Sequence, residues 1–149
     1  MIAVVVLGIL AAVAFPAYSR YIRRAKTSEA MNNVGKIYMG EVAYFSQHSE
    51  QSTASFVSAA TTPAAAPSAS KYRTQPTSFT GNSDWSAIGF SIDTPFYYAY
   101  RAVGTATDVR AEALGDLDGD GIGSTFSLSG ALNQGEIQRA PFVITNEFE

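Results

Sequence analysis

The first 19 residues of the chain, MIAVVVLGILAAVAFPAYS, contain no charged side chain. An apolar run of about 18 residues or more can cross a bilayer as a helix, because a helix satisfies its own backbone polar groups. The alternative is a helix buried in a soluble core, since a helix without a polar face needs an apolar environment on all sides. We therefore expect the chain to begin with a transmembrane helix.

Two residues weaken the expected helix. Pro16 removes one backbone hydrogen bond and clashes with the preceding turn, so a kink or local unwinding is expected there. Gly8 is a second weak point, and it also allows another helix to approach closely in lipid.

The charged residues are unevenly distributed. Residues 1–40 carry five basic side chains and one acidic side chain, and four of the basic ones cluster as Arg20, Arg23, Arg24 and Lys26. Residues 41–149 carry five basic and twelve acidic side chains. Because no basic surface accompanies this second part, nucleic acid is not expected as the main partner. The pattern favours a basic helix segment that lies against acidic surfaces of its own domain or of a neighbouring molecule.

An amphipathic pattern follows the apolar run and extends to about residue 47. Apolar residues recur at spacings of three and four, which places them on one face of a helix. They are Tyr18, Tyr21, Ile22, Ala25, Val34, Ile37, Tyr38, Val42 and Phe45. The simplest interpretation is one helix of some 45 residues, about 68 Å long at 1.5 Å per residue. Residues 1–19 form its apolar part and residues 20–48 its amphipathic part, which we expect to carry a globular domain.

The remaining chain divides into a loop and a sheet. Residues 49–76 are rich in Ser, Thr, Ala and Pro without a sustained period, which predicts a long loop. Within residues 77–149, alternating runs predict four strands, at residues 85–92, 96–103, 107–114 and 124–128. The predicted fold class is α+β: a long N-terminal α-helix packed against a four-stranded antiparallel β-sheet.

Cysteine is absent and the chain has a single histidine, His48. Disulfides, thiolate metal sites and cysteine nucleophiles are therefore excluded. His48 near a helix C-terminus is interpreted as a partner of the helix dipole. No arrangement of nucleophile, base and acid stands out, so an enzyme is the least expected class.

The segment Asp116-Leu-Asp118-Gly-Asp120-Gly121 carries the sharpest chemical signal. Alternate aspartates supply oxygen ligands, and a glycine at the sixth position allows the turn that closes a calcium loop. The match ends there, because Ser127 stands where an EF-hand has its bidentate glutamate. Calcium held by Asp116, Asp118, Asp120 and the Ile122 carbonyl is one interpretation, and an ion-free acidic hairpin turn is the other.

The N-terminal 30 residues resemble the helix of type IV pilins and pseudopilins. The resemblance lies in the segment Gly8-Ile-Leu-Ala-Ala-Val-Ala-Phe-Pro16-Ala-Tyr18, including the separation of its glycine and proline. Further along, Trp85, Ile88-Gly-Phe90, the tyrosines of residues 97–100 and the aspartate loop are similar to the larger, cysteine-free major pilins of gliding proteobacteria. The family's mature chain starts a few residues earlier, with a methylated phenylalanine and an assembly glutamate, and the glutamate is therefore not assigned to any position here.

The resemblance implies a structural subunit of type IV pilus filaments that serve twitching or gliding motility and surface adhesion. Gly8, Leu10, Ala14 and Pro16 would pack in the filament core, where the helix between Gly8 and Pro16 melts. The basic cluster would meet lipid headgroups before assembly and acidic neighbours afterwards. The implied partners are other copies of the chain, the inner membrane, minor pilins and the assembly and retraction machinery, and the implied location is the extracellular pilus.

Two alternatives remain open at this point. One is the major pseudopilin of a type II secretion system, whose subunits also carry a calcium loop. The other belongs to a different class: a membrane-anchored calcium-binding module with no assembly role.

Overall fold

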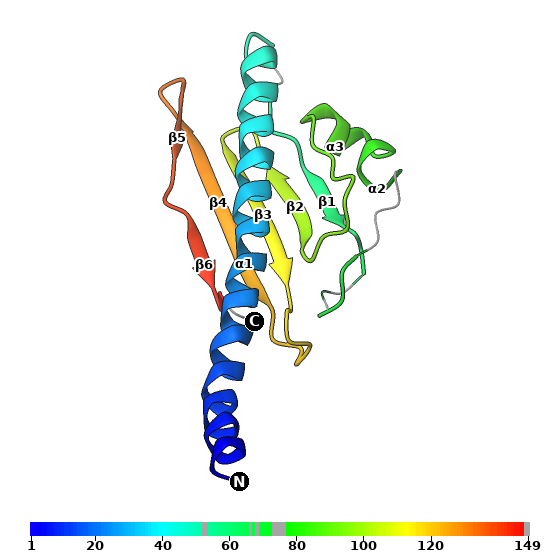
Figure 1. Ribbon diagram of the computed structural model, residues 1–149. Helices are drawn as coiled ribbons and strands as arrows, with labels where there is room; N and C mark the ends of the chain where they lie inside the picture. Colours follow the sequence, from blue (N-terminus) through cyan, green and yellow to red (C-terminus); the bar gives the residue numbers. More distant parts are fainter. Residues whose placement is uncertain (52–53, 66, 68, 73–76, 148–149) are drawn as a thin grey trace.

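The computed structural model describes residues 1–51, 54–65, 67, 69–72 and 77–147 of the 149-residue chain. Figure 1 shows a long helix lying across one face of a β-sheet, with its N-terminal part protruding beyond the sheet. The elements in chain order are α1 (Ile2–His48), β1 (Ala59–Thr62), α2 (Thr77–Thr80), α3 (Ser83–Ala87), β2 (Ala99–Gly104), β3 (Asp108–Gly115), β4 (Ser124–Asn133), β5 (Glu136–Arg139) and β6 (Val143–Thr145). Those parts of the predicted loop and sheet that fall on residues 52–53, 66, 68, 73–76 and 148–149 lie outside the described residues.

Helix α1 confirms the prediction of one helix of some 45 residues. It has 47 residues, which makes it about 70 Å long. It runs without interruption through Gly8 and Pro16, so the local unwinding expected there is absent from this structure. Proline removes only one backbone hydrogen bond, and the alanine- and leucine-containing segments on both sides retain theirs.

The sheet has six strands among the described residues, so the prediction of four strands is wrong. The strand order is β1-β2-β3-β4-β5, with β6 also paired to β4, and every pairing is antiparallel. Strand β1 lies in the segment predicted to be a loop, where Ala-Ala-Thr-Thr gives no strand signal. Strands β5 and β6 are mostly exposed and show no alternation of buried and exposed residues, which removes the pattern on which strand prediction rests.

The strand predicted at residues 85–92 is also wrong, because the short helix α3 and a loop occupy this segment. Asn82 caps α3 by accepting a hydrogen bond from the Asp84 backbone N–H at 2.8 Å. Trp85 and Ile88 are both buried, and their spacing of three fits a helical turn, whereas the spacing of two between Ile88, Phe90 and Ile92 had suggested a strand. The strand predicted at 96–103 is shorter, since β2 begins at Ala99, whereas the strand predicted at 107–114 is confirmed by β3, and β4 is longer than predicted.

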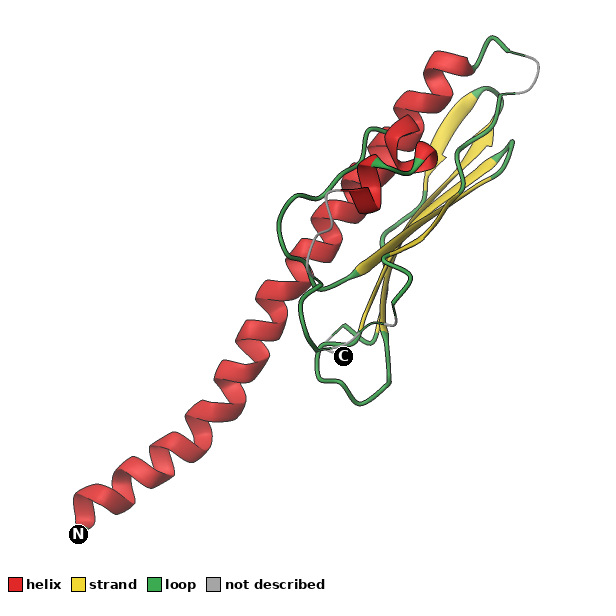
Figure 2. Ribbon diagram, turned by 90° about the vertical axis from the view of Figure 1, so that its right-hand side faces the viewer, coloured by secondary structure: helices red, strands yellow, loops and turns green. Residues whose placement is uncertain are grey.

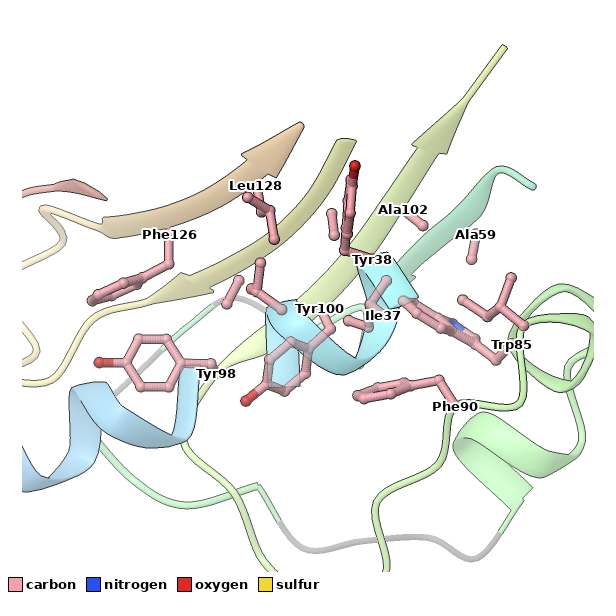
Figure 3. Close-up of a cluster of buried hydrophobic side chains, with 14 of the residues drawn as sticks. Ile37, Tyr38, Ala59, Trp85, Phe90, Tyr98, Tyr100, Ala102, Phe126 and Leu128 are labelled. Atoms are coloured by element: carbon pink, nitrogen blue, oxygen red, sulfur yellow. The ribbon is translucent and has the colours of Figure 1, made fainter. Parts of the chain in front are cut away.

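The core lies between α1 and the face of β3 and β4 against which the helix packs. Figure 3 shows Ile37 of α1 beside Tyr100 and Trp85, with Phe90 nearby, while Tyr98 lies next to Phe126. Of the predicted apolar stripe, Val34, Ile37, Tyr38 and Phe45 are buried, which confirms the seat for the domain. Tyr18 and Tyr21 are exposed instead, because the first buried residue of α1 is Thr27.

Candidate functional site

The N-terminal part of α1 is not covered by any other segment that the structure describes. Every residue from 1 to 20 is exposed, and Figure 2 shows this half extending beyond the sheet. We call residues 1–20 the free half and residues 27–48 the docked half. Within the described residues, α1 is the one helix long and apolar enough to cross a membrane.

The predicted packing residues Gly8, Leu10, Ala14 and Pro16 all lie on the free half, and the structure brings none of them against another segment of the chain. Leu10 is 61% exposed. A shallow apolar hollow of about 340 Å³ lies on the free half and is lined by Ala11, Ala14, Phe15 and Tyr18. Small residues beside a large one leave room for the backbone of another helix to approach closely.

Polar side chains fix the docked half to the sheet. Glu29 Oε1 accepts hydrogen bonds from the Tyr97 backbone N–H at 3.0 Å and from the Tyr100 hydroxyl at 3.1 Å. The Asn33 amide donates to the same Tyr100 hydroxyl at 2.9 Å. Burial, and then the Glu29 carboxylate, raise the pKa of Tyr100 above its ordinary value. The phenol therefore stays protonated and remains a donor to Glu29 across the physiological pH range.

Glu41 is a buried acid on the docked half, and the apolar stripe gave no sign of its burial. Its side chain is 0% exposed. Oε2 accepts a hydrogen bond from the Val57 backbone N–H at 2.9 Å, while Oε1 has no partner among the described residues. Burial raises the pKa of Glu41 to about 7, and the Val57 hydrogen bond offsets part of this effect. A buried carboxyl without a cation is destabilised when it ionises.

Two residues of the predicted basic cluster contact the domain, and the other two are exposed. The Arg23 guanidinium forms an ion pair with Asp118 Oδ2 at 3.0 Å, and Lys26 Nζ lies 4.2 Å from the centre of the Tyr97 ring. Both therefore face the domain of their own chain, but only Arg23 meets an acidic partner there, as the charge pattern had suggested for the chain's own domain or a neighbour. Arg20 and Arg24 are exposed, and neither forms an ion pair with any residue that the structure describes.

The aspartate loop joins β3 to β4 beside the point where α1 leaves the domain. Asp116 is buried and accepts hydrogen bonds from the backbone N–H groups of Gly119 at 2.6 Å and Gly121 at 3.1 Å. Gly119 and Gly121 have φ angles of +79° and +89°, which other residues rarely adopt. The predicted role of Gly121 in the turn is thus confirmed.

The donor set of this loop fits a calcium ion. Asp116, Asp118 and Asp120 each offer a carboxylate oxygen, and these oxygens lie within 4.8 Å of one another. Calcium binds oxygen ligands at about 2.3–2.6 Å, so ligands of one ion are separated by up to about 5 Å. Ile122 follows the third aspartate and donates its backbone N–H to Asp120 Oδ1 at 2.7 Å, while its side chain is exposed. Arg23 already neutralises part of the charge of Asp118.

Sequence analysis missed Glu29, Asn33 and Glu41 as anchors of the helix. All three fall between apolar residues of the docked half, and Glu29 and Asn33 stand four residues apart, which places them on one face. That spacing and the tyrosines of residues 97–100 were the available signals. His48, interpreted from the sequence as a partner of the helix dipole, is the last residue of α1; its Nδ1 lies 2.8 Å from the Tyr44 carbonyl oxygen, and its ring stacks on Tyr44 with a centroid distance of 4.2 Å.

No protein-family model matches this chain, and comparisons with curated proteins and with solved structures gave no match. Its function is therefore argued from the two features described above, the free half of α1 and the aspartate loop.

Proposed function

We propose that this protein is a structural subunit that polymerises into type IV pilus filaments. The observation that carries the proposal is the free half of α1, in which 20 successive residues are exposed and the first charged side chain is Arg20. Apolar surface on this scale is unstable in water, since soluble proteins rarely expose contiguous patches above a few hundred Å². It needs an apolar host outside the chain.

Two hosts satisfy this need at different times. Before assembly the free half lies in the inner membrane, where its length and lack of charge suit the hydrocarbon core. In the filament the same surface packs against the free halves of other copies, and small residues such as Gly8, Ala11 and Ala14 allow close approach. The docked half then holds the domain on the outside of the fibre.

The sequence resemblance of residues 1–30 to type IV pilins supports this assignment. By the same resemblance, minor pilins and the assembly and retraction machinery are the proposed partners, and twitching or gliding motility and adhesion are the proposed activities. The proposed location is the extracellular pilus, with a membrane pool before assembly.

The test is electron microscopy of material sheared from cells that express the full chain, combined with identification of the fibre protein. Long surface fibres made of this chain are expected. A loss of protein export on deletion, without long fibres, would instead indicate the major pseudopilin of a type II secretion system. A chain that stays monomeric in detergent and never forms fibres would contradict the proposal and favour a membrane-anchored calcium-binding module.

We propose further that Asp116, Asp118 and Asp120 bind calcium. The ion would have a structural role and would hold the β3–β4 connection in place. A ligand that binds the native state and not the unfolded chain stabilises the native state against unfolding. Calcium is expected to raise the unfolding midpoint of the wild-type chain in detergent, but not that of Asp116→Asn. Asp84→Asn, which changes an acid outside the loop, is the matched control and should respond like the wild type. Equal responses of all three proteins would exclude a site in this loop.

A further inference from the structure

Three loops at the end of the domain farthest from the N-terminus each carry one exposed acidic residue. They are the end of α1 at residues 48–51, the β2–β3 turn at residues 105–108 and the β4–β5 turn at residues 133–136, with Glu50, Asp108 and Glu136 respectively. None of these three segments contains lysine or arginine. We call Glu50, Asp108 and Glu136 the acidic tip.

The contacts between these loops place them at one end. The Leu132 backbone N–H donates to the Thr107 carbonyl at 2.6 Å, so the β4–β5 end of the sheet lies beside the β2–β3 turn. The Phe56 backbone N–H donates to the Thr105 carbonyl at 2.9 Å, and the Phe56 ring stacks on Phe45 near the end of α1. Figure 1 shows the three loops at the end of the molecule opposite the N-terminus.

The other end carries exposed positive charge on the helix. Arg20 and Arg24 are one turn apart and therefore lie on the same side of α1. We call these two residues the basic collar. Arg23, which is held by Asp118, points about 80° away from the centre of the collar at 100° per residue. The collar thus faces to one side of the aspartate loop, whose charge Arg23 partly neutralises.

We infer that the acidic tip of one copy docks against the basic collar of a second copy of this chain. The inference rests on the proposed function and names the contact between successive domains of the filament. Two complementary surfaces at opposite ends of the domain can form a head-to-tail contact, which extends without closing on itself. An antiparallel two-fold dimer could make the same pairing twice, but its two free halves would point in opposite directions and could not share one membrane or one filament core.

The length of α1 sets the offset between the two copies. The collar and the end of α1 are separated by residues 24–50, which corresponds to about 39 Å along the helix. Copies in contact should therefore be displaced by about 39 Å along the fibre axis. The free half of the upper copy then runs beside the docked half of the lower copy.

Charge reversal on each surface tests the contact. We expect Arg20→Glu/Arg24→Glu to reduce fibre yield about tenfold or more, because like charges then face each other across the contact. Glu50→Lys/Asp108→Lys/Glu136→Lys should do the same. The chain that carries both sets of changes should regain fibres, and the two defective variants expressed together should form mixed fibres. Lys36→Glu combined with Asp84→Lys, which changes charges on the body of the domain, should leave fibre yield unchanged.

The outcomes separate this contact from the proposed function. If the wild type forms no fibres, the proposed function fails and this inference fails with it. If the wild type forms fibres but both reversed variants do so equally well, or the combined chain stays defective, only the contact is overturned. Rescue of the collar variant by Asp118→Lys/Asp120→Lys in place of the tip changes would identify the neighbour's aspartate loop as the partner and overturn the proposal. A collar variant that fails to enter the membrane fraction would show a role at lipid headgroups and overturn it as well. The buried Trp85, the single tryptophan, reports by its fluorescence that each variant is folded.

Discussion

The two halves of α1 share one continuous backbone but have opposite surroundings. The docked half buries a face in which polar anchors such as Glu29, Asn33 and Glu41 alternate with apolar residues. The free half carries no charged side chain before Arg20, and all of its residues are exposed among the residues that the structure describes. Directional hydrogen bonds fix the docked half in one position on the sheet, whereas the non-directional apolar surface of the free half is compatible with any apolar environment, as the proposed function requires.

The largest expected effect comes from placing charge in the free half. Leu10→Glu/Ala14→Glu puts two carboxylates where the helix meets lipid or other copies, at a cost of about 3 kcal/mol for each charge near the centre of a membrane helix. We expect the variant to lose membrane association and fibre formation. Its domain should nevertheless fold, as judged by Trp85 fluorescence in detergent. An unfolded domain would show that the two halves are not independent.

A matched pair of isoleucine substitutions measures the difference between the halves directly. Ile37 is fully buried and Ile9 is 62% exposed. Ile37→Ala should lower the free energy of unfolding by about 2–5 kcal/mol through lost burial and a residual cavity. Ile9→Ala should change it by about 0.5 kcal/mol or less. Denaturant titration of the full chain in detergent provides both values, and similar losses at the two positions would contradict the assignment of the halves.

Glu41 makes the docked half sensitive to pH. Its pKa is raised from 4.5 to about 7 in the native state, so the native state binds this proton more tightly than the unfolded chain. The stabilisation is fully present below about pH 4.5 and is lost as the pH rises towards 7, by about 3 kcal/mol in total.

The measurement compares the wild type with Glu41→Gln between pH 4.5 and 8. Subtracting one stability curve from the other removes the contribution of all other groups that titrate. The wild type should lose stability relative to the variant as the pH rises. Parallel curves would show that Glu41 keeps its ordinary pKa.

The smallest expected effect concerns the ion pair between Arg23 and Asp118. Both side chains are partly exposed, at 34% and 26%, and such pairs contribute about 0.2–1 kcal/mol. Arg23→Gln should therefore lower the free energy of unfolding by less than about 1 kcal/mol, and less still in high salt. A loss of several kcal/mol would mean that the aspartate loop depends on Arg23 to fold.

The sequence predicted α1, β3 and the aspartate loop well because each carries a strong local signal. Residues 1–19 lack charge, Asp108–Gly115 alternates, and Asp116–Gly121 follows a fixed spacing. The prediction failed where tertiary contact decides the conformation. The spacing of two between Ile88, Phe90 and Ile92 suggested a strand, although Trp85 and Ile88 are spaced as on a helical turn, and the exposed edge strands β5 and β6 have no buried face to create a pattern.

For the candidate site, the residue types were predicted but their pairing was not. Four basic residues in seven positions indicated a cluster, yet only the packing of the sheet decides that Arg23 meets Asp118 while Arg20 and Arg24 remain exposed. Likewise, the amphipathic pattern predicted which face of α1 is buried, but not that Glu41 lies within it.

The two edges of the sheet are short or broken into two strands, and this affects whether the sheets of neighbouring copies can pair with each other. Strand β4 is bordered by β5 near one end and by β6 near the other, with Ala140, Pro141 and Phe142 between them. The opposite edge strand, β1, has only four residues and is followed by Pro63. Short edges and prolines without a backbone donor are poor templates for further strand pairing. In the proposed filament, where domains would lie side by side, the sheet edges should therefore not pair with one another, and contact between copies would be left to the helix and the loops.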